Sequence, residues 1–414
     1  MSIEHPSLLE PASFEHGVPH DYFRWLRDHD PVHWNPGRPE RERAAGIIEP
    51  EQRGFWVITR HADVVAVSKD HALFSSGRAT ALNADLRPQD LALFQSQMIH
   101  MDPPRHTALR RTINDHFKPK TIARLEPRVR ALAREIVDAV GPKGECDFVT
   151  EVAAELPLLV LAELLGVPRE ERRLLFDWTN RLIGLDDPDF GNPYDAQAAL
   201  MELFQYSAQL AHARRADPRD DLMSVLVRAE IDGRPLDFLE INMMFFLMVV
   251  AGNETTRNAI SGGIEALCAF PAQRERLLAQ PALLRTAIEE VVRWHSPVMQ
   301  FRRTATRDTE IAGQEIREND KVVVYYGAAN RDERAFAAPD VFDVGRTPNP
   351  HLGFGIGNHF CLGANLARAE MRILFEEVLR RIPDFEQTGP VERLRSNFIN
   401  GIKRMPVRFT PTPG

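Results

Sequence analysis

One segment, residues 237–270, constrains the fold more than any other part of the chain. Residues 241–251 hold a single polar residue, and Pro271 marks the expected end of the segment. At 1.5 Å per residue a helix of this length spans about 50 Å, so it must cross the whole domain that contains it. The apolar stretch is bounded by Glu240 and Asn253 and is about half as long as a bilayer requires. We therefore expect a buried helix and no membrane span.

The remaining pattern is mainly helical, with a smaller β region. Residues 102–167 and the segment after Cys361 carry apolar residues at spacings of three and four, which is typical of amphipathic helices. Aromatic and β-branched residues favour a strand at 54–60, and alternating segments near 309–327 favour further strands. The fold class expected from these patterns is α+β, dominated by helices.

We expect one domain over residues 1–414. This length exceeds the usual domain size of about 50–250 residues, but no break in composition, internal repeat or low-complexity linker divides the chain. The charged run at 37–54 is expected to be a solvated loop. Residues 182–193 are rich in helix breakers, so a mobile loop of the kind that gates sites is expected there.

Charge and cysteine content narrow the classes of function. A net charge of −8 and an isoelectric point near 6.0 disfavour a nucleic-acid-binding surface, because such a surface needs concentrated basic side chains. The three cysteines are widely spaced and offer neither a disulfide framework nor a CxxC motif, which fits a reducing compartment. The N-terminus lacks the basic start and apolar run of a signal peptide. We expect a cytoplasmic protein with no nucleic-acid partner.

A glycine-rich segment around Cys361 is the strongest chemical signal. Residues 351–364 read HLGFGIGNHFCLGA, and glycines at this density let a backbone turn sharply. A thiolate at the start of a helix is stabilised by free N–H groups, which would lower the thiol pKa and suit the sulfur to bind iron. The alternative for a lone cysteine is an inert buried thiol. A zinc site with His351 and His359 would lack the usual second ligand pair, and a dinucleotide loop would need glycine in place of Phe360.

Residues 354–363, FGIGNHFCLG, resemble the haem-binding loop of cytochrome P450 enzymes at every fixed position of the pattern FGxGxHxCxG. Further matches are AGNETT at 251–256, the ExxR sequence at 290–293 and the segment 329–346. They follow in the family's order, and DPPRHTALRR at 102–111 extends the resemblance upstream. The chain is therefore identified as a member of this family.

The resemblance implies that the long helix lies over a buried haem b, with Cys361 as the thiolate ligand of the iron. Such a ligand is electron-rich and favours cleavage of the O–O bond. The other cofactor contacts that the resemblance implies are Phe354 and Gly355 beside the thiolate, Ala251 and Gly252 on the long helix, and His106, Arg110, Arg303 and His359 as partners of the haem propionates.

Two further groups receive roles from the resemblance. Glu254 and Thr255 are similar to the family's acid and alcohol pair, which delivers protons during oxygen activation. Their alternative is a core helix whose hydroxyl bonds back to a carbonyl. Glu290, Arg293 and Arg346 resemble the ion-pair triad that retains the fold and the haem, and the alternative for the first two is a solvated pair on a helix surface.

Apolar side chains supply candidates for a substrate pocket, although core packing is the alternative for each. A pocket lined by them would take a hydrophobic substrate. The sequences AGNETTRNAISGG and SNFINGIKRMPV are similar to the bacterial branch that hydroxylates sterol side chains, methyl-branched lipids, alkanes and terpenoids. The candidates are Leu247, Val250, Val298 and Met299, with the segments 73–101, 176–210 and 398–402.

The expected activity is a monooxygenase that inserts one atom of O2 into a C–H bond and reduces the other to water. Three scattered cysteines cannot hold a four-cysteine cluster, so a ferredoxin and its NAD(P)H-dependent reductase are implied as electron donors. A basic cluster within residues 110–124 is the expected docking site, and a solvated helix face is its alternative. A peroxide-driven peroxygenase is disfavoured by the Glu254–Thr255 pair. A non-catalytic haem sensor would need an output surface or a fused output domain, and the chain has no room for a fused one.

Overall fold

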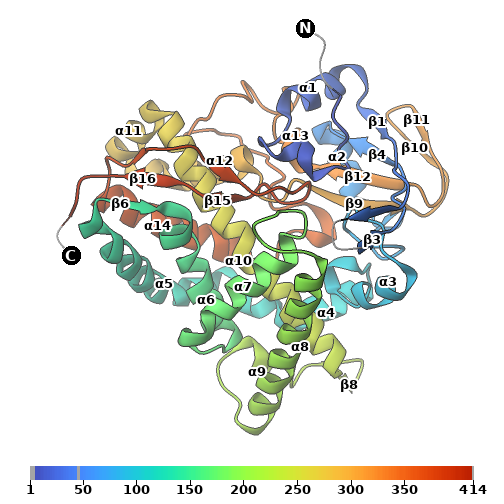
Figure 1. The fold of residues 1–414 in the computed structure, drawn as a ribbon, viewed down its shortest axis with the longest axis horizontal. Coiled ribbons are helices and arrows are strands. Elements are labelled where there is room, and N and C mark those ends of the chain that lie inside the picture. Colours follow the sequence, from blue (N-terminus) through green and yellow to red (C-terminus); the bar gives the residue numbers. More distant parts are fainter. Residues whose placement is uncertain (1–4, 44–46, 413–414) are drawn as a thin grey trace.

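The computed structural model describes residues 5–43 and 47–412 and consists mainly of helices, with the strands of the largest sheet at one side (Figure 1). This confirms the helix-dominated α+β class. The helices are α1 (His20–His29), α2 (His61–Lys69), α3 (Pro88–Phe94), α4 (Arg105–Ile113), α5 (Pro119–Val140), α6 (Glu155–Leu165), α7 (Arg172–Ile183), α8 (Pro193–Ala216), α9 (Leu222–Leu226), α10 (Phe238–Ala269), α11 (Pro271–Ala279), α12 (Leu284–His295), α13 (Tyr326–Ala329) and α14 (Ala364–Arg381).

The strands are short and most of them pair locally. They are β1 (Val32–Asn35), β2 (Arg41–Arg43), β3 (Ile47–Glu49), β4 (Phe55–Ile58), β5 (Phe74–Ser75), β6 (Glu145–Asp147), β7 (Glu230–Ile231), β8 (Arg234–Pro235), β9 (Gln300–Ala305), β10 (Thr309–Ile311), β11 (Gln314–Ile316), β12 (Lys321–Tyr325), β13 (Glu386–Gln387), β14 (Glu392–Arg393), β15 (Ile402–Arg404) and β16 (Pro406–Arg408).

Helix α10 is the long helix expected at 237–270. Asp237 accepts a hydrogen bond from the N–H of Glu240 at 2.9 Å, and the Glu240 carboxylate accepts one from the N–H of Asp237 at 2.9 Å. This reciprocal cap fixes the start of the helix. Its 32 residues span about 48 Å. The helix packs against α6, α7, α8, α12 and α14, so it runs through the largest apolar core.

A five-stranded sheet in the order β1-β4-β12-β9-β5 forms the main β region. Strand β12 is parallel to β4, where Val324 faces Ile58, and antiparallel to β9. All five residues of β12 are buried because apolar clusters cover both faces of the sheet. The strands expected at 54–60 and 309–327 are confirmed as β4 and as β10, β11 and β12.

The loop predictions are partly wrong. The run 37–54 was expected to be a loop throughout, but it contains the antiparallel pair β2–β3, in which Glu42 faces Ile48. Residues 44–46 lie outside the described part of the chain. The interruption expected at 182–193 is present, since α7 ends at Ile183 and α8 begins at Pro193. Within the described residues, no helix is long and apolar enough to cross a membrane.

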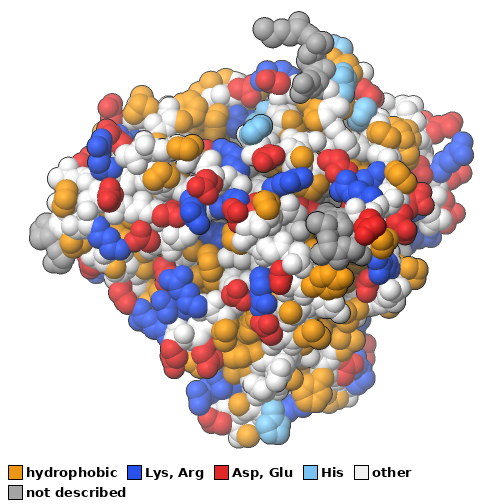
Figure 2. Space-filling model, in the orientation of Figure 1, with side chains coloured by type: hydrophobic (Ala, Val, Ile, Leu, Met, Phe, Trp, Pro, Cys, Tyr) orange, Lys and Arg blue, Asp and Glu red, His pale blue; other side chains and the backbone are white. Residues whose placement is uncertain are grey.

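Acidic and basic side chains lie interspersed on the face shown in Figure 2. Charges of both signs in alternation are typical of a surface in contact with water. Most of the residues to which the sequence analysis assigned chemical roles lie around an internal cavity, between α10 and the segment that precedes α14.

Candidate active site

The loop before α14 holds Cys361 in a backbone conformation that two glycines make possible. Gly355 and Gly357 have φ angles of 68° and 78°, in the left-handed region that favours glycine. A Cβ on Gly357 would lie 2.7 Å from the carbonyl oxygen of Ser68, at the end of α2, so any side chain there would collide with the backbone. The N–H of Cys361 donates to the carbonyl of Phe354 at 2.8 Å and closes the turn.

The Cys361 thiol lies three residues before Ala364, the first residue of α14. Burial raises the pKa of this thiol, while the Gly363 N–H and the guanidinium groups of Arg110 and Arg368 act in the opposite direction. The sequence predicted a lowered thiol pKa from the helix N-terminus, and for the protein chain alone that prediction is wrong, because desolvation outweighs the positive groups. A coordinated metal ion would reverse the balance, since it stabilises the thiolate directly.

An apolar cavity separates the Cys361 loop from α10. Ala251 and Gly252 lie in the middle of α10 but are exposed to the cavity. A methyl group and a hydrogen atom fill little space, so the cavity extends to the helix backbone there. The predicted cofactor residues that line this one cavity are Cys361, Phe354, Gly355, His359, His106, Arg110, Ala251 and Gly252. The long helix and the cysteine loop therefore form two opposing walls of one site.

Cationic and imidazole groups gather at one edge of this cavity. The rings of His106 and His359 lie 4.3 Å apart between centroids. Arg110 lines the cavity, and Arg303 is hydrogen-bonded to the hydroxyl of Tyr326, which also lines it. Among the described residues, none of these four side chains forms an ion pair with an acidic residue.

This edge has unsatisfied hydrogen-bonding groups. His106 Nδ1 and His359 Nε2 are buried and have no partner within the described residues. Burial and then Arg110 lower the pKa of His106 to about 4, while burial and then Arg303 lower the pKa of His359 well below its usual value. Buried groups of this kind need an anionic or hydrogen-bonding partner. The two carboxylates of a haem fit this requirement.

Glu254 and Thr255 occupy successive positions on α10 but face different surroundings. Thr255 lines the cavity, and its hydroxyl donates to the Ala251 carbonyl at 2.8 Å, as the structural alternative expects. Glu254 is buried and forms an ion pair with Arg257, and it also accepts from Asn258 at 2.8 Å. The relay role expected of Glu254 requires a connection to solvent, and in this structure its carboxylate is buried and paired with Arg257.

The structure brings Glu290, Arg293 and Arg346 together behind the cysteine loop. Arg293 donates to both carboxylate oxygens of Glu290, at 2.7 and 2.8 Å, and Arg346 donates to the same carboxylate at 3.0 Å. Arg293 also donates to the carbonyls of Asn330 and Pro339, at 2.8 and 2.9 Å. Because Glu290 and Arg293 have no exposed surface, the solvated-pair alternative does not describe them.

Two of the four predicted substrate-pocket residues lie outside the cavity wall. Leu247 and Val298 line it, but Val250 packs against the main core, because one residue along a helix turns the side chain by about 100° from Ala251. Met299 joins the apolar cluster under the sheet, since successive residues of an extended chain point to opposite sides. The segment 73–101 contributes Met98 and Ile99, whereas 176–210 and 398–402 contribute no lining residue.

Several wall residues were missed because they come from elements distant in the sequence. Leu161 and Leu164 of α6, Phe301 of β9 and Tyr326 of α13 line the cavity. The close approach of α6 is visible at Gly252, where a Cβ would lie 3.1 Å from Leu161 Cδ1. No residue spacing in the sequence predicts such contacts, because they depend on how the helices cross.

Comparisons with known proteins point to one family. The cytochrome P450 family model matches residues 194–390. A steroid C26-monooxygenase of Rhodococcus jostii (strain RHA1) is 41% identical over 411 residues, covering 98% of this chain and 85% of that protein. A methyl-branched lipid omega-hydroxylase of Mycobacterium tuberculosis (strain ATCC 25618 / H37Rv) is 44% identical and covers 86% of this chain and 84% of that protein.

A solved structure agrees with these relatives over the whole fold. The cytochrome P450 of Mycobacterium marinum in complex with pseudoionone has a TM-score of 0.90 and 39% sequence identity. The match covers 99% of this chain and 100% of that chain. The similarity therefore includes the elements that form the cavity, α10 and the Cys361 loop as well as the sheet.

Proposed function

Because this chain belongs to the cytochrome P450 family and is a monooxygenase, we propose that it hydroxylates a branched, hydrophobic molecule near the end of its carbon chain. The observation that carries the proposal is the cavity between α10 and the cysteine loop, with Cys361 on one wall, apolar side chains around it and uncompensated cations at one edge. We further propose that residues 1–414 act as a single catalytic domain in the cytoplasm.

The family binds haem, and we propose haem b for this chain. Cys361 would ligate the iron, while His106, Arg110, Arg303 and His359 would hold the propionates. When bound, a thiolate-ligated haem supplies the iron chemistry that activates O2. The protein residues around it exclude water, orient the substrate and move protons.

Thr255 and Glu254 are proposed to carry those protons. The Thr255 hydroxyl lies on the cavity wall and can pass a proton from its oxygen into the site once its bond to the Ala251 carbonyl opens. Once its carboxylate leaves Arg257, Glu254 would take up a proton from water and pass it to Thr255, which replaces the proton that the hydroxyl has given up.

Thr255→Ala should lower the rate of product formation by about 10²-fold while leaving substrate affinity nearly unchanged, because proton transfer acts in the transition state. Electrons would then be released as hydrogen peroxide. NADH consumption, peroxide and product are measured together. Ser261→Ala is a matched control, since the Ser261 hydroxyl donates to the Arg257 carbonyl at 2.9 Å on the same helix but does not line the cavity. Equal coupling in the two variants would remove Thr255 from the relay.

The substrate proposal rests on the cavity and on the relatives. Leu161, Leu164, Leu247, Val298 and Phe301 offer an apolar surface that would orient an aliphatic chain with few polar contacts. The relatives act at C26 of a steroid and at the omega position of methyl-branched lipids, both of which are chain ends. Sterol side chains, branched lipids, hydrocarbons and terpenoids all fit this description.

The test is a titration of the haem-loaded protein with a 3-keto sterol, a methyl-branched fatty acid and an acyclic terpene alcohol, followed by the spin-state spectrum and by product analysis. We expect saturable shifts and a hydroxyl group at the branched end. A straight-chain fatty acid is the control. Binding of the straight chain as tightly as its methyl-branched counterpart would contradict the proposed preference.

Two other functions are separated by simple measurements. A peroxide-driven peroxygenase would form product from hydrogen peroxide alone at the rate seen with electron donors. A haem sensor would form no product with any donor. The Glu254–Thr255 pair favours the monooxygenase, because peroxide already carries the protons that the pair would deliver.

We propose that an acidic ferredoxin, reduced by an NAD(P)H-dependent reductase, docks beside α4 and the start of α5. Arg111, Lys118, Lys120 and Arg124 are exposed there. The same segment touches the cysteine loop, since Arg110 donates to the Asn358 carbonyl at 3.5 Å. Complementary charge at this position would raise the rate of association.

Reversing Arg111 and Lys118 to glutamate should slow reduction by an acidic [2Fe–2S] ferredoxin and flatten the dependence of its rate on salt, because these charges act within about 10 Å at 0.1 M ionic strength. Substrate affinity should stay unchanged. Arg307 and Arg317 are exposed near the β10–β11 hairpin, and their reversal serves as the control. The same salt slope in both double variants would place the docking site elsewhere.

A further inference from the structure

A second pocket lies outside the cavity that holds Cys361. It is formed by the start of α5, by the short 3-10 helix Pro281–Leu283, by α12, by the first half of α14 and by residues 346–349. Its volume is about 770 Å³. No lining residue is common to the two sites. Its size falls within the range of about 300–1,000 Å³ typical of small-molecule sites. The haem and substrate proposals above make no use of it, and at the start of α5 it adjoins the proposed ferredoxin site.

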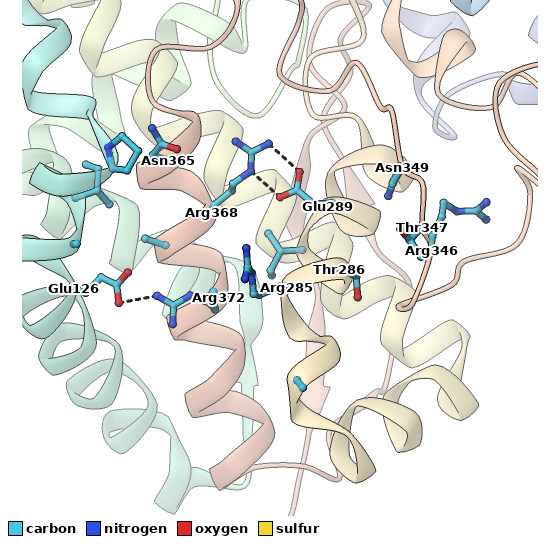
Figure 3. A pocket seen from close by; sticks show the side chains of 16 residues that line it. Glu126, Arg285, Thr286, Glu289, Arg346, Thr347, Asn349, Asn365, Arg368 and Arg372 are labelled. Carbon is cyan, nitrogen blue, oxygen red and sulfur yellow. Dashed lines mark hydrogen bonds and ion pairs between the residues drawn. The ribbon is translucent and has the colours of Figure 1, made fainter.

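Ion pairs hold two arginines of α14 against the sides of this pocket (Figure 3). Arg368 donates to both carboxylate oxygens of Glu289, at 2.7 and 2.9 Å. Arg372 pairs with Glu126 of α5 at 2.7 Å and with Glu376 at 3.0 Å. These contacts fix both guanidinium groups but leave Arg368 Nη1 and Arg372 Nε without a hydrogen bond among the described residues.

The acidic residues of the wall are already neutralised. Burial alone would raise the pKa of Glu289, but hydrogen bonds from His351 and Arg368 hold it at about 2, so the carboxylate is ionised and paired. Glu126 faces Arg372. Neither carboxylate is therefore a free negative charge that would repel an anion from the pocket.

Arg285 is the arginine of this pocket that takes no part in an ion pair with a described residue. It extends from α12 and is drawn in Figure 3 between the Arg368–Glu289 pair and the Arg372–Glu126 pair. It forms no ion pair or side-chain hydrogen bond with any described residue. Among the charged residues that line the pocket, four arginines face two glutamates, and Arg346 is the fourth, held by Glu290. The pocket thus presents a free guanidinium group between two fixed ones.

A second unsatisfied group lies in the wall beside residue 346. Asn349 Nδ2 donates to Glu290 at 3.3 Å, which leaves Asn349 Oδ1 as an acceptor, and this oxygen is buried without a partner among the described residues. An acceptor calls for a donor such as a hydroxyl group. The pocket therefore combines guanidinium donors for an anion with an acceptor for a neutral polar group.

We propose that this pocket binds a phosphate group, either free or carried by a small hydroxylated molecule. Arg285 would contact the phosphate oxygens, with Arg368 Nη1 and Arg372 Nε as further donors, because guanidinium groups bind phosphate oxygens with charge-assisted hydrogen bonds. A hydroxyl of the organic part would donate to Asn349 Oδ1. A phosphate carries about 1.5 to 2 negative charges at pH 7. Arg285 is the guanidinium group of the lining that no carboxylate of a described residue neutralises, so it is available to pair with such an anion.

The experiment is calorimetric titration of the haem-loaded protein in a phosphate-free buffer with inorganic phosphate, AMP and adenosine as separate probes. We expect saturable binding of AMP, weaker or equal binding of inorganic phosphate and no binding of adenosine. AMP binding more tightly than phosphate identifies an organic phosphate as the ligand, and equal affinities identify the free ion. Binding should weaken as salt is added.

Arg285→Gln should weaken binding of the phosphate probes by about tenfold, which corresponds to about 1.4 kcal/mol, and Arg285→Lys should restore part of it. Arg285 has no partner whose loss would unfold the chain.

Arg317→Gln is the matched control, because Arg317 is exposed and its side chain forms no ion pair with a described residue. No saturable binding of either phosphate probe, equal binding of adenosine and AMP, or equal affinity in the Arg285 and Arg317 variants would overturn the proposal. If Arg285→Glu slows only the reaction with ferredoxin and neither phosphate probe binds, the pocket belongs to a protein interface and the proposal is wrong.

Discussion

Cys361→His should abolish the thiolate-type absorption band of the reduced, carbon-monoxide-saturated protein, even where haem remains bound. Cys361 is the thiol on the wall of the cavity, and the closed turn with Phe354 fixes its place. An imidazole is neutral and donates less electron density than a thiolate, so product formation should be lost together with the band. This is the largest change expected from any single substitution.

The control for this experiment is Cys268→Ser, because Cys268 lies near the end of α10 and does not line the cavity. It should keep both the band and the activity. Absorbance is recorded for wild type and both variants after reconstitution with the same amount of haem. A wild-type spectrum with only the band of a histidine-ligated haem would show that Cys361 is not the ligand.

Arg293→Met should destabilise the protein by about 3–5 kcal/mol, because it leaves the buried Glu290 carboxylate with only one of its two arginine partners. The carbonyls of Asn330 and Pro339 would lose their hydrogen bonds from Arg293 as well. Removal of a buried ion-pair partner costs more than the pair contributes, since the remaining charge stays away from water. The midpoint of urea unfolding and the amount of haem retained are the measurements.

Arg128→Met provides the matched control. Arg128 also pairs with a glutamate through two nitrogens, but both Arg128 and Glu163 are exposed. Surface pairs of this kind contribute less than about 1 kcal/mol. A similar fall in the unfolding midpoint for Arg293→Met and Arg128→Met would contradict the proposed structural role of the buried triad.

Local sequence signals predicted the elements that frame the site. The capping residues Asp237 and Glu240 and the following Pro271 define the ends of α10, and these effects act within a few residues. The glycines before Cys361 predicted a tight turn, and their left-handed φ angles agree with it. Predictions from such short-range signals hold in the folded chain, because helix ends and tight turns need no distant contact to form.

Local signals failed where a side chain's surroundings come from elsewhere. Met299 and Val298 are neighbours with similar chemistry, but only Val298 faces the cavity. The contact of Glu254 with Arg257 was also missed, although it spans only three residues, because a helix offers several partners and burial selects among them.

By itself, the sequence determined the helix-dominated fold class, the course of the long helix and the cysteine loop, because helix caps, glycine turns and apolar periodicity are encoded over short distances. Tertiary structure alone decided how the thiol is desolvated, which apolar residues of α6, β9 and α13 complete the cavity, and that Arg285 faces a pocket built from α5, α12 and α14. These features depend on which helices cross and how closely they pack. Such crossings bring together residues more than a hundred positions apart, so no local pattern records them.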